Sequence, residues 1–374
     1  MTVRYVRVNP TTELFAPAVR AFGSLAVIGR VTLPSPPPDG AAEVGVPITF
    51  TDPTEARRRA PGDLGDAVAL AFAQSPGPSS VTAVRVSESS PDWQAALDEV
   101  ARLDVQLVVL ANTPLDDDTG VPDGALVSLA EHVASVSTTG GDGKQRMGVA
   151  MLAKDSADPT PVTGVLASER MVYVAHRSSQ DAAAAVAGTI AGYQPHISML
   201  LKQVNITSEP FSQAEIEDLN GTETELSGPA GNGVNWLTSP AIIPGSGVYL
   251  GEGYTGNPGG KKFIDIVRTV DDITFRLNAQ LIKTIGNVRI GRSGLRALIA
   301  QLEAILGVQV QNGVLNGFEV FVPLLALLDK DPATLTAGEA KRINDAQAQR
   351  VVEVMAAIQY AGAVHRLSIA LKFK

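Results

Sequence analysis

Cysteine is absent from this chain of 374 residues, and aromatic residues make up only 5 % of it. Without cysteine the protein has neither a disulfide framework nor a metal site built on thiolates. No apolar run approaches the roughly 20 residues that a membrane-spanning helix needs, and the N-terminus lacks the apolar core of a secretory signal. The sequence therefore predicts a protein that does not insert directly into a membrane.

Excess positive charge is lacking as well, since the formal net charge is −9 at pH 7. An acidic balance of this size argues against general binding of nucleic acid. Hydrophobic residues at 45 % and charged residues at 18 % are ordinary values for a globular protein. The length allows two or three domains. We therefore expect a multidomain cytosolic protein with no nucleic-acid partner.

Strand and helix patterns alternate through the first half of the chain. The expected strands are 24–29, 80–86, 105–111, 147–153 and 170–175, and the expected helices are 63–73, 92–103, 125–137 and 180–191. Near-continuous apolar strands separated by helices favour an α/β domain whose largely parallel sheet is covered on both faces. Residues 33–40 include four prolines, which predict an exposed loop.

The pattern changes near residue 259, after a glycine-rich stretch. The expected elements beyond it are amphipathic helices at 262–285 and 294–306, a strand at 318–322 and a polar helix at 336–349. Thr336 and Glu339 form a capping-box pattern at the start of that last helix. Residues 351–360 fit either a continuation of the helix or a strand. This part of the chain is expected to be α+β.

Both ends of the chain have strand patterns. His365, Leu367, Ile369, Leu371 and Phe373 alternate with polar or small residues, which is the period of a half-buried strand. The N-terminal pattern covers Val3, Arg4, Tyr5, Val6, Arg7 and Val8. These end strands could pair within their own subunit, or they could be added to the sheets of neighbouring copies. The pattern alone is compatible with both arrangements.

Signatures of catalysis are missing from the sequence. The histidines His132, His176, His196 and His365 do not have the spacing of a metal site. Residues 253–262 resemble a phosphate loop, but a threonine occupies the position of its first glycine and a lysine that of its final Ser/Thr. No nucleophile elbow occurs. We therefore predict no catalytic residue, no metal and no cofactor; the alternative is an α/β hydrolase or a nucleotide enzyme.

Four segments carry a resemblance to a known family. They are Ala185-Val-Ala-Gly-Thr-Ile-Ala-Gly-Tyr-Gln-Pro195, Asn232-Gly-Val-Asn-Trp236, Gly251-Glu-Gly-Tyr-Thr255 with Phe263-Ile-Asp-Ile-Val-Arg-Thr-Val-Asp271, and Gly362-Ala-Val-His365. In this order and spacing they resemble the tail sheath proteins of contractile injection machines, which include myovirus tails and R-type bacteriocins. None of the four is a catalytic signature.

The resemblance implies an outer α/β domain over residues 21–258. It implies an inner α+β domain over 259–374, joined by the N-terminal arm 1–20 and completed by terminal strands exchanged between subunits. The implied exchanged strands are Val3–Val8 and Leu367–Phe373. Phe318, Val320 and Val322 are implied to lie on a partner strand, and no enzymatic activity is implied.

The resemblance also implies a function. A sheath subunit polymerises as stacked hexameric rings around an inner tube, then contracts to drive the tube through a target envelope. Its partners would be other copies of itself, the inner tube protein, and baseplate and terminator proteins. It would assemble in the host cytoplasm and end in a virion tail or contractile particle. The alternative is another structural component of such a machine.

The charged faces of two inner-domain helices are expected to include the surface that meets the tube. The residues concerned are Asp265, Arg268, Asp272, Arg276, Lys341 and Arg342.

Overall fold

The computed structural model describes residues 22–116, 118–121, 124–138, 144–222, 231–245, 247–282, 284 and 286–365. Contacts divide this part of the chain into two compact units. The larger unit holds residues 22–272 and 362–365, and the smaller unit holds residues 273–361. The assignment of residues 1–20, 21–258 and 259–374 to an arm, an outer domain and an inner domain stays a prediction.

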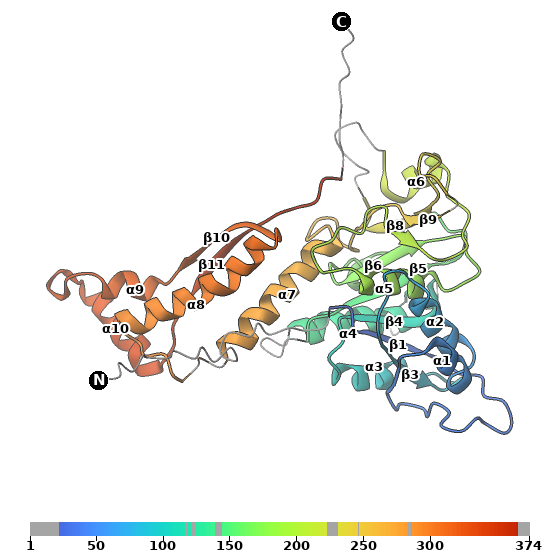
Figure 1. The fold of residues 1–374 in the computed structure, drawn as a ribbon, viewed down its shortest axis with the longest axis horizontal. Coiled ribbons are helices and arrows are strands. Elements are labelled where there is room, and N and C mark those ends of the chain that lie inside the picture. Colours follow the sequence, from blue (N-terminus) through green and yellow to red (C-terminus); the bar gives the residue numbers. More distant parts are fainter. Residues whose placement is uncertain are drawn as a thin grey trace, which may run out of the picture. The chain divides into compact units, whose positions relative to one another are not determined.

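A single large sheet is the centre of the larger unit (Figure 1). Among the described residues its strands follow the order β2-β3-β1-β4-β5-β6-β8-β9-β7. Their bounds are β1 Leu25–Arg30, β2 Ile48–Phe50, β3 Val81–Val86, β4 Leu107–Leu115, β5 Met147–Leu152, β6 Met171–Ala175, β7 Gln203–Val204, β8 Val234–Thr238 and β9 Val248–Leu250. Neighbouring strands from β3 to β8 are parallel, whereas β2, β9 and β7 pair antiparallel at the two sides. The expected α/β fold with a largely parallel sheet is confirmed.

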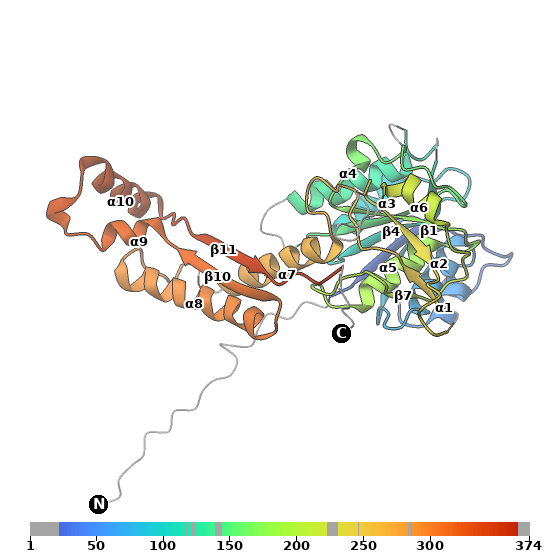
Figure 2. The same cartoon turned by 90° about the horizontal axis from the view of Figure 1, so that it is seen from above.

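Helices cover both faces of this sheet, as Figure 2 shows. One face carries α1 (Pro53–Arg59), α2 (Asp63–Phe72) and α5 (Ala182–Gly192), and the other carries α3 (Trp93–Ala101), α4 (Ala125–Thr138) and α6 (Gln213–Asn220). Strand side chains alternate between the two cores, as with Val27 on one side and Ile28 on the other. A sheet buried on both faces explains why its strands are almost continuously apolar.

Helix α5 has no exposed side, because every residue from Ala182 to Ala191 is buried. Its small side chains let neighbouring backbones approach closely. A Cβ atom added at Gly188 would lie 2.6 Å from the carbonyl oxygen of Ala71 in α2. Asp181 caps the helix by accepting a hydrogen bond from the Ala184 N–H at 2.9 Å, and burial raises the pKa of this carboxyl group.

A fully buried arginine ties the end of α3 to the start of β5. The Arg146 guanidinium donates hydrogen bonds to the carbonyl oxygens of Val100 at 2.8 Å and Leu103 at 3.0 Å. It also lies 3.3 Å from Nε2 of His132. Since a guanidinium can only donate, Nε2 of His132 is the acceptor and the ring is neutral. Burial, and secondarily the Arg146 cation, lower the pKa of His132 from 6.5 to about 4.

We expect this histidine to make the protein less stable in acid. The unfolded chain takes up a proton on His132 near pH 6.5, whereas the folded chain does not do so until about pH 4. Stability is therefore lost as the pH falls through that window. The free energy of unfolding, measured with urea, should fall between pH 7.5 and 5.0. This fall should be about 2 kcal/mol smaller in His132→Gln than in the wild type. Equal losses in the two proteins would contradict this assignment.

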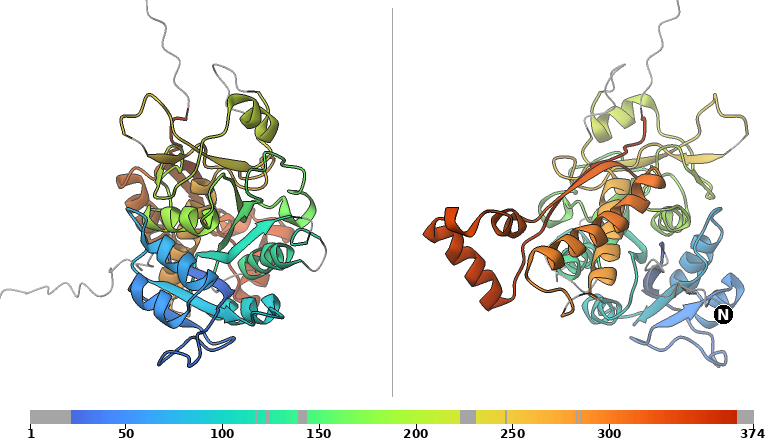
Figure 3. Two further views of the ribbon diagram at one scale, coloured as in Figure 1. Left: turned by 90° about the vertical axis from the view of Figure 1, so that its right-hand side faces the viewer. Right: turned by 60° about the vertical axis from the view of Figure 1, so that its left-hand side comes forward.

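The smaller unit is built around a two-stranded antiparallel ribbon, β10 (Leu315–Phe321) and β11 (Met355–Tyr360). Helix α8 (Arg292–Gln311) packs along the ribbon with the end of α7 (Ile264–Leu281). Helices α9 (Pro323–Leu328) and α10 (Ala337–Gln349) lie beside one another at one end of the ribbon (Figure 3). Their apolar contacts form a second small core around Leu295, Val322 and Leu324.

Several expectations for this region are corrected or resolved. The expected helix over 262–285 spans Ile264–Leu281, and the expected strand at 318–322 begins earlier, at Leu315, and ends at Phe321. The capping box of Thr336 and Glu339 is confirmed. Residues 351–360 contain a strand rather than more helix, because α10 ends at Gln349 and its C-cap residue, Arg350, has a left-handed φ of 57°.

Candidate functional site

The ribbon of β10 and β11 is the main candidate for an assembly site. Within the described residues this sheet has two strands, so each strand has an unpaired edge. Strand β11 is exposed from Met355 to Gln359 and half-buried at Tyr360. An unpaired edge presents a row of backbone N–H and C=O groups that can bind a further strand. The ribbon can therefore accept a strand from another polypeptide segment.

The two faces of the ribbon differ in their surroundings. Phe318 and Val320 of β10 pack against the core formed with α7 and α8. On the opposite face Phe321 and Met355 form a cross-strand pair and are 51 % and 49 % exposed. The pair gives this face of the ribbon a small exposed apolar area that another chain could cover.

Not every residue expected at strand exchange lies on the ribbon. Phe318 and Val320 do, whereas Val322 lies beyond the end of β10, at the N-cap of α9, and is buried. The expected exchanged strands, Val3–Val8 and Leu367–Phe373, lie outside the described residues. Their role in strand exchange stays a prediction.

The residues expected to face the tube fall into two groups. Asp265 and Arg268 are buried within the larger unit, so the expectation that they lie on a solvated helix face is wrong. Arg268 donates a hydrogen bond to the carbonyl oxygen of Tyr193 at 2.9 Å, and burial lowers its pKa to about 10. The remaining residues are accessible: Asp272 and Arg276 are half-buried, and Lys341 and Arg342 are exposed.

Two segments that carried the family resemblance meet at Asn235, which is fully buried. The Asn235 side chain donates to the carbonyl oxygens of Tyr173 at 3.0 Å and Tyr254 at 2.9 Å. Its Oδ1 accepts a hydrogen bond from the Tyr254 N–H at 2.7 Å. One amide group thereby connects β6 and β8 to the segment that precedes α7. Asn235, the second asparagine of the Asn-Gly-Val-Asn motif, therefore has a structural role.

The glycine of the same motif is required by its backbone. Gly233 has a φ of 81°, and a Cβ atom there would lie 2.7 Å from the carbonyl oxygen of Thr255. Asn232 before it donates to the carbonyl oxygen of Leu219 at 2.8 Å, which fixes the loop against α6. Residues 232–235 are thus packed closely against residues 254–256.

We expect Asn235→Ala to lower the free energy of unfolding by about 3 kcal/mol, because it leaves three buried backbone groups without their partner. Asn205→Ala is the matched control. Asn205 is an exposed residue whose side chain donates to the carbonyl oxygen of Ala73, and its loss should cost less than about 1 kcal/mol. Urea unfolding followed by circular dichroism measures both. Equal stability of the two variants would show that the Asn235 network is not important for the fold.

A second polar cluster in the larger unit involves the end of the described chain. His365 lies between Glu252 and Ser198, at 3.1 Å from Oε2 and 2.9 Å from Oγ respectively. Its ring packs on Phe263, with 4.7 Å between centroids. Glu252, Phe263 and His365 all belong to segments that carried the family resemblance, and the structure brings them together.

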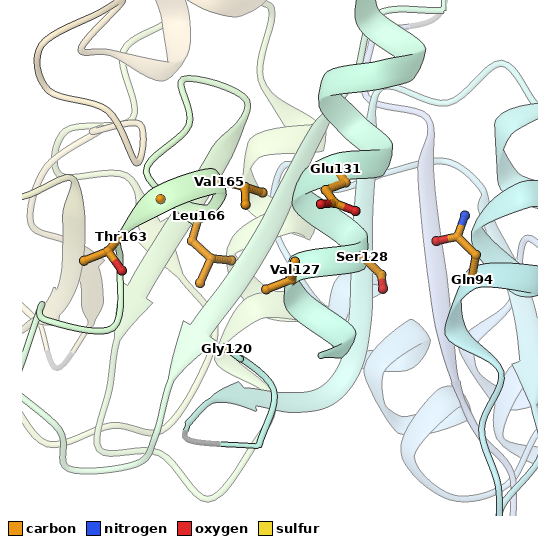
Figure 4. A pocket seen from close by; sticks show the side chains of 9 residues that line it. Gln94, Gly120, Val127, Ser128, Glu131, Thr163, Val165 and Leu166 are labelled. Atoms are coloured by element: carbon orange, nitrogen blue, oxygen red, sulfur yellow. The ribbon is translucent and has the colours of Figure 1, made fainter. Parts of the chain in front are cut away.

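A cavity of about 490 Å³ lies between α4 and the loop at residues 163–166 (Figure 4). It is lined by Gln94, Gly120, Val127, Ser128, Glu131, Thr163, Gly164, Val165 and Leu166. Glu131 is the one ionisable residue among these, and the hydroxyl groups of Ser128 and Thr163 line the same cavity.

The described residues lack two further features. No group of three or more His, Cys, Asp or Glu residues in this part of the chain could hold a metal ion. No helix there is both long and apolar enough to span a membrane.

Comparison with solved structures gives full-length matches at low sequence identity. The chain matches the anti-feeding prophage (AFP) helical sheath in its contracted state with a TM-score of 0.66 and 14 % identity, covering 100 % of this chain and 98 % of that one. It matches the sheath complex of an extracellular contractile injection system, PVC, in its contracted state with a TM-score of 0.66, 12 % identity and the same coverage. A chain of the AFP baseplate matches with a TM-score of 0.65 and 15 % identity, again over 100 % and 98 % of the two chains. No protein-family model and no curated protein matches the sequence.

The predicted resemblance to contractile sheath proteins is therefore confirmed as a likeness of fold. The mixed α/β architecture with its large, mainly parallel sheet is the architecture of these sheath chains.

Proposed function

We propose that this protein is a structural subunit of a contractile sheath, which polymerises as stacked hexameric rings around an inner tube and contracts to drive that tube through a target envelope. The observation that carries the proposal is the match of the whole chain to AFP and PVC sheath chains, at a TM-score of 0.66 for each. Many unrelated proteins share a common α/β domain, so a match to the larger unit alone would say little. A match that covers both units of the chain is therefore stronger support.

Strand exchange is the proposed means of assembly. The ribbon of β10 and β11 has unpaired edges, and residues 367–373 and 3–8 have the sequence pattern of strands. A donated strand would form backbone hydrogen bonds with a neighbour's ribbon edge, and these do not depend on side-chain identity. Such links can persist while subunits move relative to one another during contraction.

The proposed partners are further copies of this chain, an inner tube protein, and baseplate and terminator proteins. Asp272, Arg276, Lys341 and Arg342, the accessible members of the expected charged set, are the residues proposed to face the tube. Assembly would take place in the host cytoplasm, and the mature protein would belong to a virion tail or contractile particle. The proposed role is structural rather than enzymatic, and the match to sheath chains supports it.

Negative-stain electron microscopy of the purified full-length protein tests the proposal. Helical tubes, or rings of about the diameter of a sheath, are the expected result. A protein that stays monomeric at all concentrations, both alone and in the presence of a cognate tube protein, would contradict it.

A further inference from the structure

The side chain of His365 holds the last described residues of the chain on the larger unit. It contacts Glu252 and Ser198 through its two ring nitrogens and Phe263 through its face. Glu252 is buried, so the carboxylate meets the imidazole away from bulk solvent, where a hydrogen bond is stronger. We call Ser198, Glu252, Phe263 and His365 the His365 anchor.

The position of the anchor in the sequence is informative. Val364 directly before it is 78 % exposed, and the residues at 362 and 363 are exposed as well. His365 is therefore the residue through which this short stretch is held. The nine residues from Arg366 to Lys374 follow it and contain the strand pattern.

We infer that the His365 anchor is the fixed root of the donated C-terminal strand, so that it sets the point on the subunit from which the strand departs. This inference rests on the proposed strand exchange. Nine fully extended residues span at most about 30 Å, so the receiving ribbon edge must begin within that distance of His365. An unanchored tail would sample more starting positions, and its capture by a neighbour would cost more conformational entropy.

The same three polar groups have the order of a hydrolase triad, serine to histidine to acid. Three observations favour anchoring over catalysis. Ser198 Oγ already accepts a hydrogen bond from the Leu200 N–H at 3.2 Å, and Ser198 is not among the residues that line the cavity of Figure 4. The sequence around Ser198 also lacks the glycines of a nucleophile elbow.

Limited trypsin digestion of the unassembled full-length protein tests the anchor directly, because Arg366 is a trypsin site next to His365. A protease must bind several residues before the cleaved bond, and the anchor restrains them. Cleavage after Arg366, followed by mass spectrometry, should be about tenfold faster in His365→Ala, since two hydrogen bonds that oppose local opening are lost. His365→Gln keeps a donor for Glu252 and should give an intermediate rate.

Val364→Ala is the matched control, since it changes an exposed neighbour and should leave the cleavage rate unchanged. His365→Ala should also raise the protein concentration needed for tube formation, again by about tenfold. A wild-type cleavage rate in His365→Ala would overturn the anchor, even if removal of residues 367–374 abolishes tubes. Labelling of Ser198 by a fluorophosphonate probe in the wild type, but not in His365→Ala, would also overturn it in favour of a reactive serine. Tubes formed by a protein without residues 367–374 would show that the proposed strand donation is wrong. The digestion experiment would still show whether His365 anchors the chain.

Discussion

Deletion of residues 367–374 should abolish the formation of sheath-like tubes and leave the rest of the protein folded. The deleted segment contains the four apolar residues that define the C-terminal strand pattern, and a neighbour's ribbon would lose its donated strand. Folding should persist because the two large cores of the α/β unit are built by described residues between Leu25 and Val267. Pelleting and electron microscopy should detect less than about a tenth of the wild-type amount of polymer, with an unchanged circular dichroism spectrum.

Two point variants make this test sharper. Ile369→Pro removes one backbone donor from the proposed strand and should weaken assembly. The double variant Lys372→Ala with Lys374→Ala keeps every backbone N–H group and the whole apolar face, so it should assemble as the wild type does. Normal tubes from the truncated protein would show that the C-terminal strand is not exchanged.

Charge placed on the ribbon face that carries Phe321 and Met355 should block assembly as strongly as the deletion of residues 367–374 does. Phe321 and Met355 form a half-exposed apolar pair, so a double change to Phe321→Asp and Met355→Glu should alter folding stability by no more than about 1 kcal/mol. In an assembled sheath the same carboxylates would be buried at an interface without partners, at a cost of several kcal/mol per subunit, on the order of 3. The expected result is a folded protein that does not polymerise.

Ile242→Asp is the control for this variant. Ile242 is 92 % exposed and lies in the loop between β8 and β9 of the larger unit, away in sequence from the ribbon. A carboxylate there should affect neither folding nor tube formation. Assembly of the Phe321 and Met355 double variant at the wild-type concentration would show that this face of the ribbon stays uncovered.

The elements that sequence reasoning located well are those whose burial follows a simple period. The helix expected at 63–73 is α2, and the strand expected at 147–153 is β5, because a sheet covered on both faces leaves a plain apolar signature. Helix α9 was missed because Pro-Leu-Leu-Ala-Leu-Leu has no polar residue to reveal a helical period. Helix α1 was missed because its seven residues are mostly polar and show no apolar helical period.

The candidate sites were harder to predict, since they depend on contacts between distant segments. Asp265 and Arg268 had the periodicity of a solvated face, but α7 is covered on more than one side in the larger unit and buries both residues. His365 was expected only as one of the residues on the apolar face of a terminal strand. Its contacts with Ser198 and Glu252, 167 and 113 residues away, could not be read from local spacing. Glu252 and His365 belong to segments that resemble sheath proteins, and this was the available signal, whereas Ser198 lies outside those segments.

Helix α5 gives the larger unit a mechanical property. A helix with protein on every side cannot slide along its sheet without displacing close-packed atoms above and below it, and such interiors are nearly incompressible. In elastic terms, the close packing around α5 makes this core resist deformation. If the subunit works in a contracting sheath, little of the released energy would be dissipated by deformation inside this unit, and most of it would go into the displacement of whole subunits.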